Sequence, residues 1–89
     1  MSQVIASYNI GNSKGVHGRV ATKLAEIALE FDVEVLIEHN GSQVSCDSIL
    51  DVLSMALVHG SEVQVILSGE KARSALVEIG AVLTAENDP

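Results

Sequence analysis

Alternating apolar and polar residues predict four β-strands in this chain. Residues 4–10, 33–37 and 63–67 all alternate with a period of two. The pair Asn40-Gly41 is typical of a tight hairpin turn because both residue types accept positive φ angles, so residues 43–46 are expected to return as a strand. Each strand has a single apolar face, which favours an antiparallel sheet with one side buried and the other in water.

Apolar residues at helical spacing follow the first strand and the last strand. From Arg19 they recur at i, i+4, i+7 and i+8 and predict an amphipathic helix: Val20, Leu24, Ile27, Ala28 and Phe31. A final helix is expected from Glu70 to about Leu83, although Gly80 lowers its helix propensity by up to about 1 kcal/mol, and residues 85–89 are expected to form a loose tail. With a short helix near residues 47–55, the order is βαββαβα. This order predicts an α+β open-faced β-sandwich, a four-stranded antiparallel sheet with three helices on one face.

Length and composition narrow the classes of function. The 89 residues are enough for a single domain, 1–89, with a modest core and a site on its surface. A net charge of −7 with five Lys and Arg residues argues against nucleic acid as a partner. The lone Cys46 excludes an internal disulfide and a CxxC metal site and favours a reducing compartment, which predicts a cytoplasmic protein. No segment has the pattern of a signal peptide or a membrane span, so we expect no membrane insertion.

Candidate chemistry is concentrated in the segment Lys14-Gly15-Val16-His17-Gly18-Arg19. His17 or Gly18 falls at the cap of the first helix, so open backbone N–H groups would form an anion site there. The helix dipole disfavours imidazolium and favours a neutral, nucleophilic His17, and Arg19 offers bidentate donors to phosphate. No neighbouring acid in the sequence would activate water, which favours a carrier of phosphate over a hydrolase. The alternative is an ordinary loop histidine.

Residues 15–24, GVHGRVATKL, resemble the active-site segment of HPr, the histidine-containing phosphocarrier of the bacterial sugar phosphotransferase system. The family pattern is Gly-apolar-His-x-Arg-Pro-Ala. Asn40-Gly41 and residues 47–55 resemble the family's turn and regulatory-serine helix, and the resemblance extends from Val4 to about Leu83.

This resemblance implies the HPr-like fold and a role in phosphoryl transfer. His17, by family analogy through Nδ1, would accept a phosphoryl group from phosphorylated enzyme I, charged from phosphoenolpyruvate, and pass it to an EIIA domain. Arg19 and the backbone N–H of Gly18 would steady the moving group. We expect a transferase component of sugar transport without turnover of its own, a monomer that needs no metal or cofactor.

The helix after Cys46 is a second candidate site, with Asp47 expected as its N-cap. Its apolar residues spread over roughly 220° around the helix axis, more than a short helix can bury. An exposed cluster of Ile49, Leu50 and Leu53 is therefore expected, with ordinary core packing as the alternative. The resemblance implies that enzyme I and EIIA dock on these three residues. It also matches Ser48 to the serine that HPr kinase/phosphorylase modifies with ATP in many members, although a capping role also explains this serine.

The chain departs from the family pattern at four positions. Val20 replaces the usual proline, Gly18 stands where alanine or threonine is common, Asp51 replaces lysine or glycine, and Glu26 stands where basic residues are common. These changes bear on docking to enzyme I and leave, as an alternative, a regulatory HPr-like protein of nitrogen-related or catabolite-control signalling. A second alternative is a small ligand-binding regulatory domain of similar layout, which would not be phosphorylated.

Overall fold

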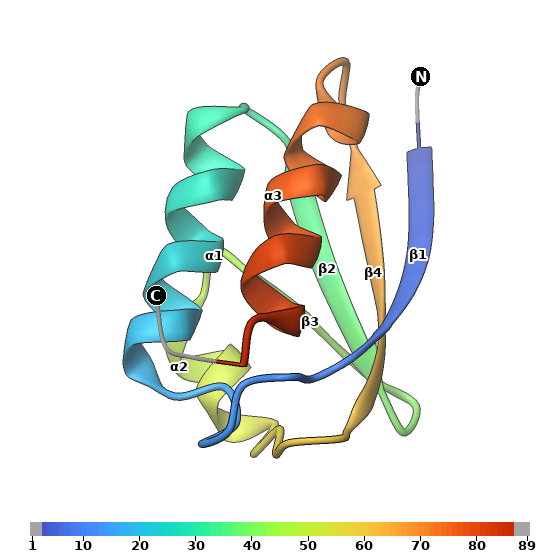
Figure 1. Cartoon of the computed structure of the whole chain (residues 1–89). Helices are drawn as coiled ribbons and strands as arrows, with labels where there is room; N and C mark the ends of the chain where they lie inside the picture. Colours follow the sequence, from blue (N-terminus) through green and yellow to red (C-terminus); the bar gives the residue numbers. More distant parts are fainter. Residues whose placement is uncertain (1–2, 87–89) are drawn as a thin grey trace.

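The computed structural model describes residues 3–86, and their helices and strands follow in the predicted order (Figure 1). The elements are β1 (Gln3–Asn9), α1 (Gly18–Glu30), β2 (Glu34–His39), β3 (Ser42–Ser45), α2 (Ile49–Ser54), β4 (Glu62–Ser68) and α3 (Ala72–Thr84). The strands form one antiparallel sheet in the order β1-β4-β2-β3. The three helices lie on one side of this sheet (Figure 1). The predicted α+β open-faced sandwich is therefore confirmed.

The hydrophobic core lies between the sheet and the helices. On the central strand β4, alternate residues are buried against the helices while their neighbours face the open side: Val63, Val65 and Leu67 are the buried ones. Leu24 of α1 and Ile79 of α3 are fully buried opposite this face. The amphipathic patterns of strand and helix thus meet in one core, as their periods require.

Two glycine-dependent features shape the fold. Asn40 and Gly41 have φ angles of 51° and 84°, and they close the hairpin between β2 and β3, whose last pair is His39 with Ser42. Gly80 of α3 packs directly on β1, because a Cβ atom at this position would lie 2.6 Å from the Tyr8 hydroxyl. The glycine that weakens the helix locally therefore allows its close approach to the sheet.

Two sequence predictions on where helices begin are wrong. The last helix begins at Ala72, not Glu70, because Gly69, with a φ of 141°, forms a turn before it. The N-cap of α2 is Ser48, not Asp47, whose backbone N–H donates to Ser45 Oγ in the preceding turn (3.4 Å).

The expected loose tail at residues 85–89 is also wrong for its first two residues. The carbonyl of Ala85 accepts a hydrogen bond from Asn12 Nδ2 at 2.9 Å, and that of Glu86 accepts one from Ser13 N at 3.2 Å. Residues 87–89 lie outside the described part of the chain. Among the helices of residues 3–86, none combines the length and apolar character that crossing a bilayer requires.

Candidate functional site

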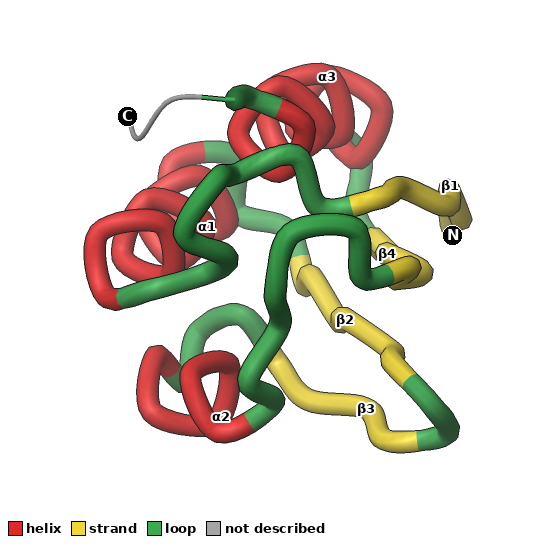
Figure 2. The backbone as a smooth tube through the Cα atoms, turned by 60° about the horizontal axis from the view of Figure 1, so that its bottom comes forward, coloured by secondary structure: helices red, strands yellow, loops and turns green. Residues whose placement is uncertain are grey.

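His17 stands at the end of the loop that joins β1 to α1. Gly15, with a φ of +71°, turns the chain two residues before it. Val16 N then donates a 3.0 Å hydrogen bond to Leu57 O, in the segment that follows α2. In Figure 2 this loop runs alongside the α2–β4 connection, between the ends of α3 and α2. The histidine is thereby brought to the end of the molecule where α1 begins.

The structure places His17 at the N-cap of α1. The sequence had left either His17 or Gly18 as the cap residue. Its backbone is extended, with φ −103° and ψ −172°, and its carbonyl accepts the first helical hydrogen bond from Ala21 N at 2.9 Å. Its Nδ1 accepts a hydrogen bond of 3.3 Å from Arg19 N, and the side chain is half-buried. Because a nitrogen that accepts a hydrogen bond carries a lone pair, this geometry assigns the ring proton of the neutral form to Nε2.

The first turn of α1 is suited to an anion. It contains no acidic residue. The sequence predicted open N–H groups here, and the structure differs at one of them, since Arg19 N already bonds the His17 ring. The N–H groups of Gly18 and Val20 precede the first residue whose N–H is bonded within the helix, Ala21. A phosphate near Nδ1 would meet these donors and the positive end of the helix dipole.

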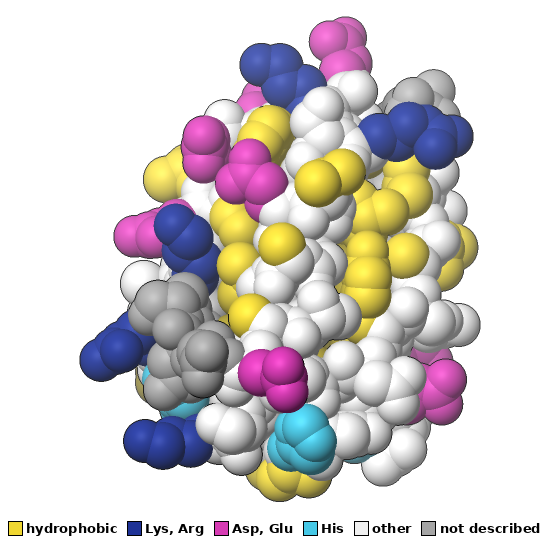
Figure 3. All heavy atoms as spheres, in the orientation of Figure 1, with side chains coloured by type: hydrophobic (Ala, Val, Ile, Leu, Met, Phe, Trp, Pro, Cys, Tyr) yellow, Lys and Arg dark blue, Asp and Glu magenta, His cyan; other side chains and the backbone are white. Residues whose placement is uncertain are grey.

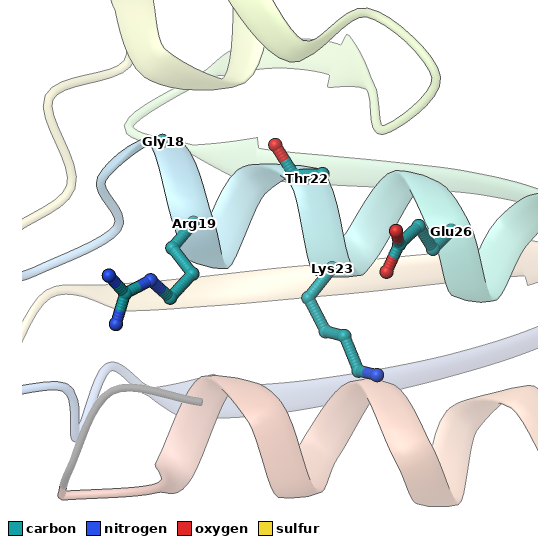
Figure 4. Close-up of a pocket in the computed structure, with 5 residues that line it drawn as sticks. All are labelled: Gly18, Arg19, Thr22, Lys23 and Glu26. Carbon is teal, nitrogen blue, oxygen red and sulfur yellow. The ribbon is translucent and has the colours of Figure 1, made fainter.

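Basic side chains gather beside this turn. Lys14, Arg19 and Lys23 supply three of the five Lys and Arg residues of the whole chain. Figure 4 shows Arg19 and Lys23 on the same side of α1, the side that faces α3, along an open hollow that Thr22 and Glu26 also line. Within residues 3–86 the Arg19 guanidinium forms no ion pair. It is therefore available to an incoming anion.

The second candidate segment lies at the same end of the molecule (Figure 2). Of the three predicted docking residues, Leu50 is 77% exposed, whereas Ile49 and Leu53 are half-buried and pack against the core. Ser48 is half-buried, and its side chain makes no capping hydrogen bond. The exposed apolar surface of α2 is thus mainly Leu50, which neighbours the exposed carboxylate of Asp51.

The space-filling view shows how charge is distributed around this site. Basic side chains appear in two areas, at the lower left near the start of α1 and at the top, with acidic side chains between them and elsewhere on the face shown (Figure 3). The two remaining basic residues of the chain, Lys71 and Arg73, lie at the start of α3. A partner that approaches His17 therefore meets the basic end of an acidic protein.

Two contributors to the site were missed by the sequence patterns. Leu57 supplies the carbonyl that accepts from Val16 N, and Asn12, within the loop itself, has a completely buried side chain. Asn12 lies in a stretch of turn-forming residues, and no local pattern indicates a long-range contact. The described residues contain no group of three or more His, Cys, Asp or Glu side chains placed to hold a metal ion.

Comparison with known proteins agrees with this geometry. The family model described as the PTS HPr component phosphorylation site matches residues 4–85. The HPr phosphocarrier of Bacillus anthracis str. Ames is 25% identical, with a TM-score of 0.86 over 93% of this chain and 99% of that one. The histidine-containing phosphocarrier of a mycoplasma is 30% identical, with a TM-score of 0.80 over 89% and 90% of the two chains. Crh, the catabolite-repression HPr of Bacillus subtilis, is 29% identical, with a TM-score of 0.72 over 89% and 91%, in a crystal structure described as a swapped dimer.

Proposed function

This chain belongs to the HPr family of phosphocarrier proteins of the phosphotransferase system, and we propose that His17 is its phosphoryl acceptor, with phosphorylated enzyme I as donor and an EIIA domain as acceptor. The observation that carries the proposal is the position of His17 Nδ1 at the N-terminus of α1, 3.3 Å from Arg19 N. A nucleophilic nitrogen and backbone donors for an anion thus occupy the same point.

The chemical step follows from this arrangement. The Nδ1 lone pair forms a new N–P bond while the N–P bond of the donor phosphohistidine breaks and its electron pair returns to the donor imidazole. The proton on Nε2 stays in place. The hydrogen bond from Arg19 N is long, so the amide exchanges the ring nitrogen for a phosphoryl oxygen at little cost.

The transferred group would be stabilised mainly by electrostatics. Its transition state carries charge on the equatorial oxygens, so oriented donors suffice and the carrier needs no metal of its own. The N–H groups of Gly18 and Val20 and the Arg19 guanidinium are these donors. Because the first turn of α1 has no acidic residue, it offers no carboxylate to direct water at the new N–P bond.

Intact mass spectrometry tests this proposal. The chain is incubated with enzyme I, phosphoenolpyruvate and magnesium, and one added phosphoryl group, lost in mild acid, is expected. His17→Ala should abolish the addition. His59→Ala is the matched control, because His59 is an exposed histidine whose Nδ1 lies 3.2 Å from Gly11 O in the same loop region. Phosphorylation that persists in His17→Ala, or is absent from the wild-type chain, would refute the role of His17.

Arg19 and Gly18 are proposed to act through different groups. Arg19→Lys keeps the positive charge but loses the planar fork, so slower transfer is expected although His17 is intact. Gly18 contributes only its backbone N–H, and nothing lies within 4 Å of a Cβ added there. Gly18→Ala is therefore expected to transfer phosphate at the wild-type rate. Equal losses in both variants would contradict this division of roles.

Docking of enzyme I and EIIA is proposed to use Ile49, Leu50 and Leu53, in a cytoplasmic carrier that serves sugar uptake. The exposure of Leu50 near His17 supports this surface. The exposed carboxylates of Asp51 and Glu26 would require basic groups on the partner, in contrast to Arg19 and Lys23, which would require acidic ones. Transfer to EIIA domains that work only in signalling would instead favour the regulatory branch.

Regulation at Ser48 is the second proposed function. The half-buried Ser48 side chain makes no capping bond, and the similarity to Crh, a catabolite-repression protein, adds to its support. A phosphate there would place more negative charge beside Asp47 and Asp51 and would oppose docking. With ATP and HPr kinase/phosphorylase, an acid-stable phosphoryl group is expected that disappears in Ser48→Ala and persists in Ser54→Ala. An unchanged mass with the kinase from the same organism would refute this regulation.

A further inference from the structure

We propose that Asn12 is a positioning residue for phosphoryl transfer: its carboxamide fastens the end of α3 to the loop that presents His17. This inference rests on the proposed role of His17 as phosphoryl acceptor. Within residues 3–86, Asn12 is the fully buried polar side chain of the fold. Burying a polar group costs free energy unless the group forms hydrogen bonds, so the hydrogen bonds of a buried side chain indicate its role.

The carboxamide of Asn12 has a defined orientation. Its Nδ2 donates to Val82 O at 3.0 Å and to Ala85 O at 2.9 Å. Both partners are carbonyl oxygens, so the nitrogen, not the oxygen, must face them. The Oδ1 atom is buried and has no donor within the described residues. The two bonds to the end of α3 are therefore the contacts that account for this side chain.

The neighbouring backbone makes the same connection. Gly11 N donates to Leu83 O at 2.8 Å, and Ser13 N donates to Glu86 O at 3.2 Å. Residues 11–13 thus supply hydrogen bonds to the carbonyl groups at the C-terminal end of α3, which would otherwise be unsatisfied. In Figure 2 the loop passes close to this end of α3 before it reaches α1.

On its other side, Asn12 is joined to the histidine. Its own carbonyl accepts a 2.9 Å hydrogen bond from Gly15 N, and Gly15 is the turn residue two positions before His17. One residue therefore links the end of α3 to the turn that aims the imidazole. Since the bond from Arg19 N to His17 Nδ1 is 3.3 Å long, a small shift of this turn is enough to break it and to move Nδ1 away from the N–H groups of Gly18 and Val20.

Asn12→Ala tests this link. The variant leaves the carbonyls of Val82 and Ala85 without their donor and frees the loop. We expect the maximal rate of transfer from enzyme I to fall about tenfold to a hundredfold, as misplacement of a reacting group by about 1 Å does. The KM for enzyme I should change little, because Leu50 is untouched. The transfer rate of Asn12→Ser, which keeps one hydroxyl donor, should lie between those of the wild type and Asn12→Ala. This milder variant keeps the test possible if Asn12→Ala folds poorly.

Two further readouts separate positioning from a loss of stability. Val65→Ala removes buried volume from the middle of β4 and should lower the stability of the fold. At assay temperatures well below its melting temperature, this variant should transfer phosphate at the wild-type rate. The Arg19 amide resonance should shift in both Asn12 variants and stay in place in Val65→Ala. Transfer by both Asn12 variants within threefold of the wild-type rate, with an unmoved Arg19 amide, would overturn the inference. A wild-type chain that enzyme I does not phosphorylate would instead refute the proposed function and leave the amide resonance as the test of Asn12.

Discussion

Glycines on either side of His17 are expected to respond to the same substitution in opposite ways. Gly15 has a φ of +71°, and a Cβ there would collide with the Leu57 carbonyl oxygen and lie 3.0 Å from Val58 Cα. Gly18 has no atom within 4 Å of an added Cβ and no left-handed φ. Comparison of Gly15→Ala with Gly18→Ala therefore separates the effect of backbone constraint from the effect of a substitution near His17.

For Gly15→Ala, three effects act in the same direction. A left-handed non-glycine residue costs about 1–2 kcal/mol, and the displaced segment loses the bond from Val16 N to Leu57 O, about 0.5–1.5 kcal/mol. Moving the backbone to make room for the added Cβ atom costs about a further 1–3 kcal/mol. We expect a loss of about 2.5–6.5 kcal/mol, and hence a melting temperature at least about 10 °C lower for a domain of this size. Gly18→Ala should instead stabilise the fold by about 0.4–1 kcal/mol.

Thermal and urea unfolding, followed by circular dichroism, measure both variants under one set of conditions. Equal m-values for the two variants and the wild type would show that the compactness of the end states is unchanged. If Gly15→Ala melts within about 3 °C of the wild type, a displacement that corresponds to less than about 1 kcal/mol, the constraint inferred at this turn is wrong.

Three further predictions test other parts of the molecule. Leu50→Ser should slow transfer from enzyme I with stability unchanged to within about 0.5 kcal/mol. Leu29→Ser, at an 83% exposed position on α1, should change neither the transfer rate nor the stability. Equal transfer rates in the two variants would remove Leu50 from the docking surface. Gly80→Ala should destabilise the wild type by about 1–3 kcal/mol but not a Tyr8→Ala background, since the collision is with that ring; additive effects would contradict this contact. Burial, with a contribution from Asp47, raises the pKa of the Cys46 thiol from 9.0 to about 12. The unfolded thiol therefore ionises first, stability should fall as pH rises from 9.0 towards 12, and Cys46→Ala should reduce that slope in urea titrations.

Patterns along the chain predicted the fold because each is set locally. Alternation marked the strands, and the buried Val63, Val65 and Leu67 are on the face that it indicated. The Asn40-Gly41 turn formed where its residue types favour positive φ. Helix starts were less predictable, because a turn that precedes a helix competes for the same residues. Asp47 joins the turn through Ser45, and the cap position passes to Ser48.

Long-range contacts at the site could not be predicted in this way. Asn12 bonds to a residue 70 positions along the chain, and a local pattern shows only a turn. The partial burial of Ile49 and Leu53 depends on how α2 is rotated on the sheet, which spacing alone does not fix. The positions of His17 and Arg19 agree with the sequence reasoning, while their roles in transfer, like those of Ser48 and the docking residues, stay predictions.

The path of the chain affects how a purification tag or fluorophore is best attached. Because Ser13 N donates to the Glu86 carbonyl, a tag joined after this residue would start beside the loop that leads to His17. Gln3, by contrast, is at the opposite end of the seven-residue β1, about 20 Å away along the strand. Labels for transfer assays therefore belong at the beginning of the chain.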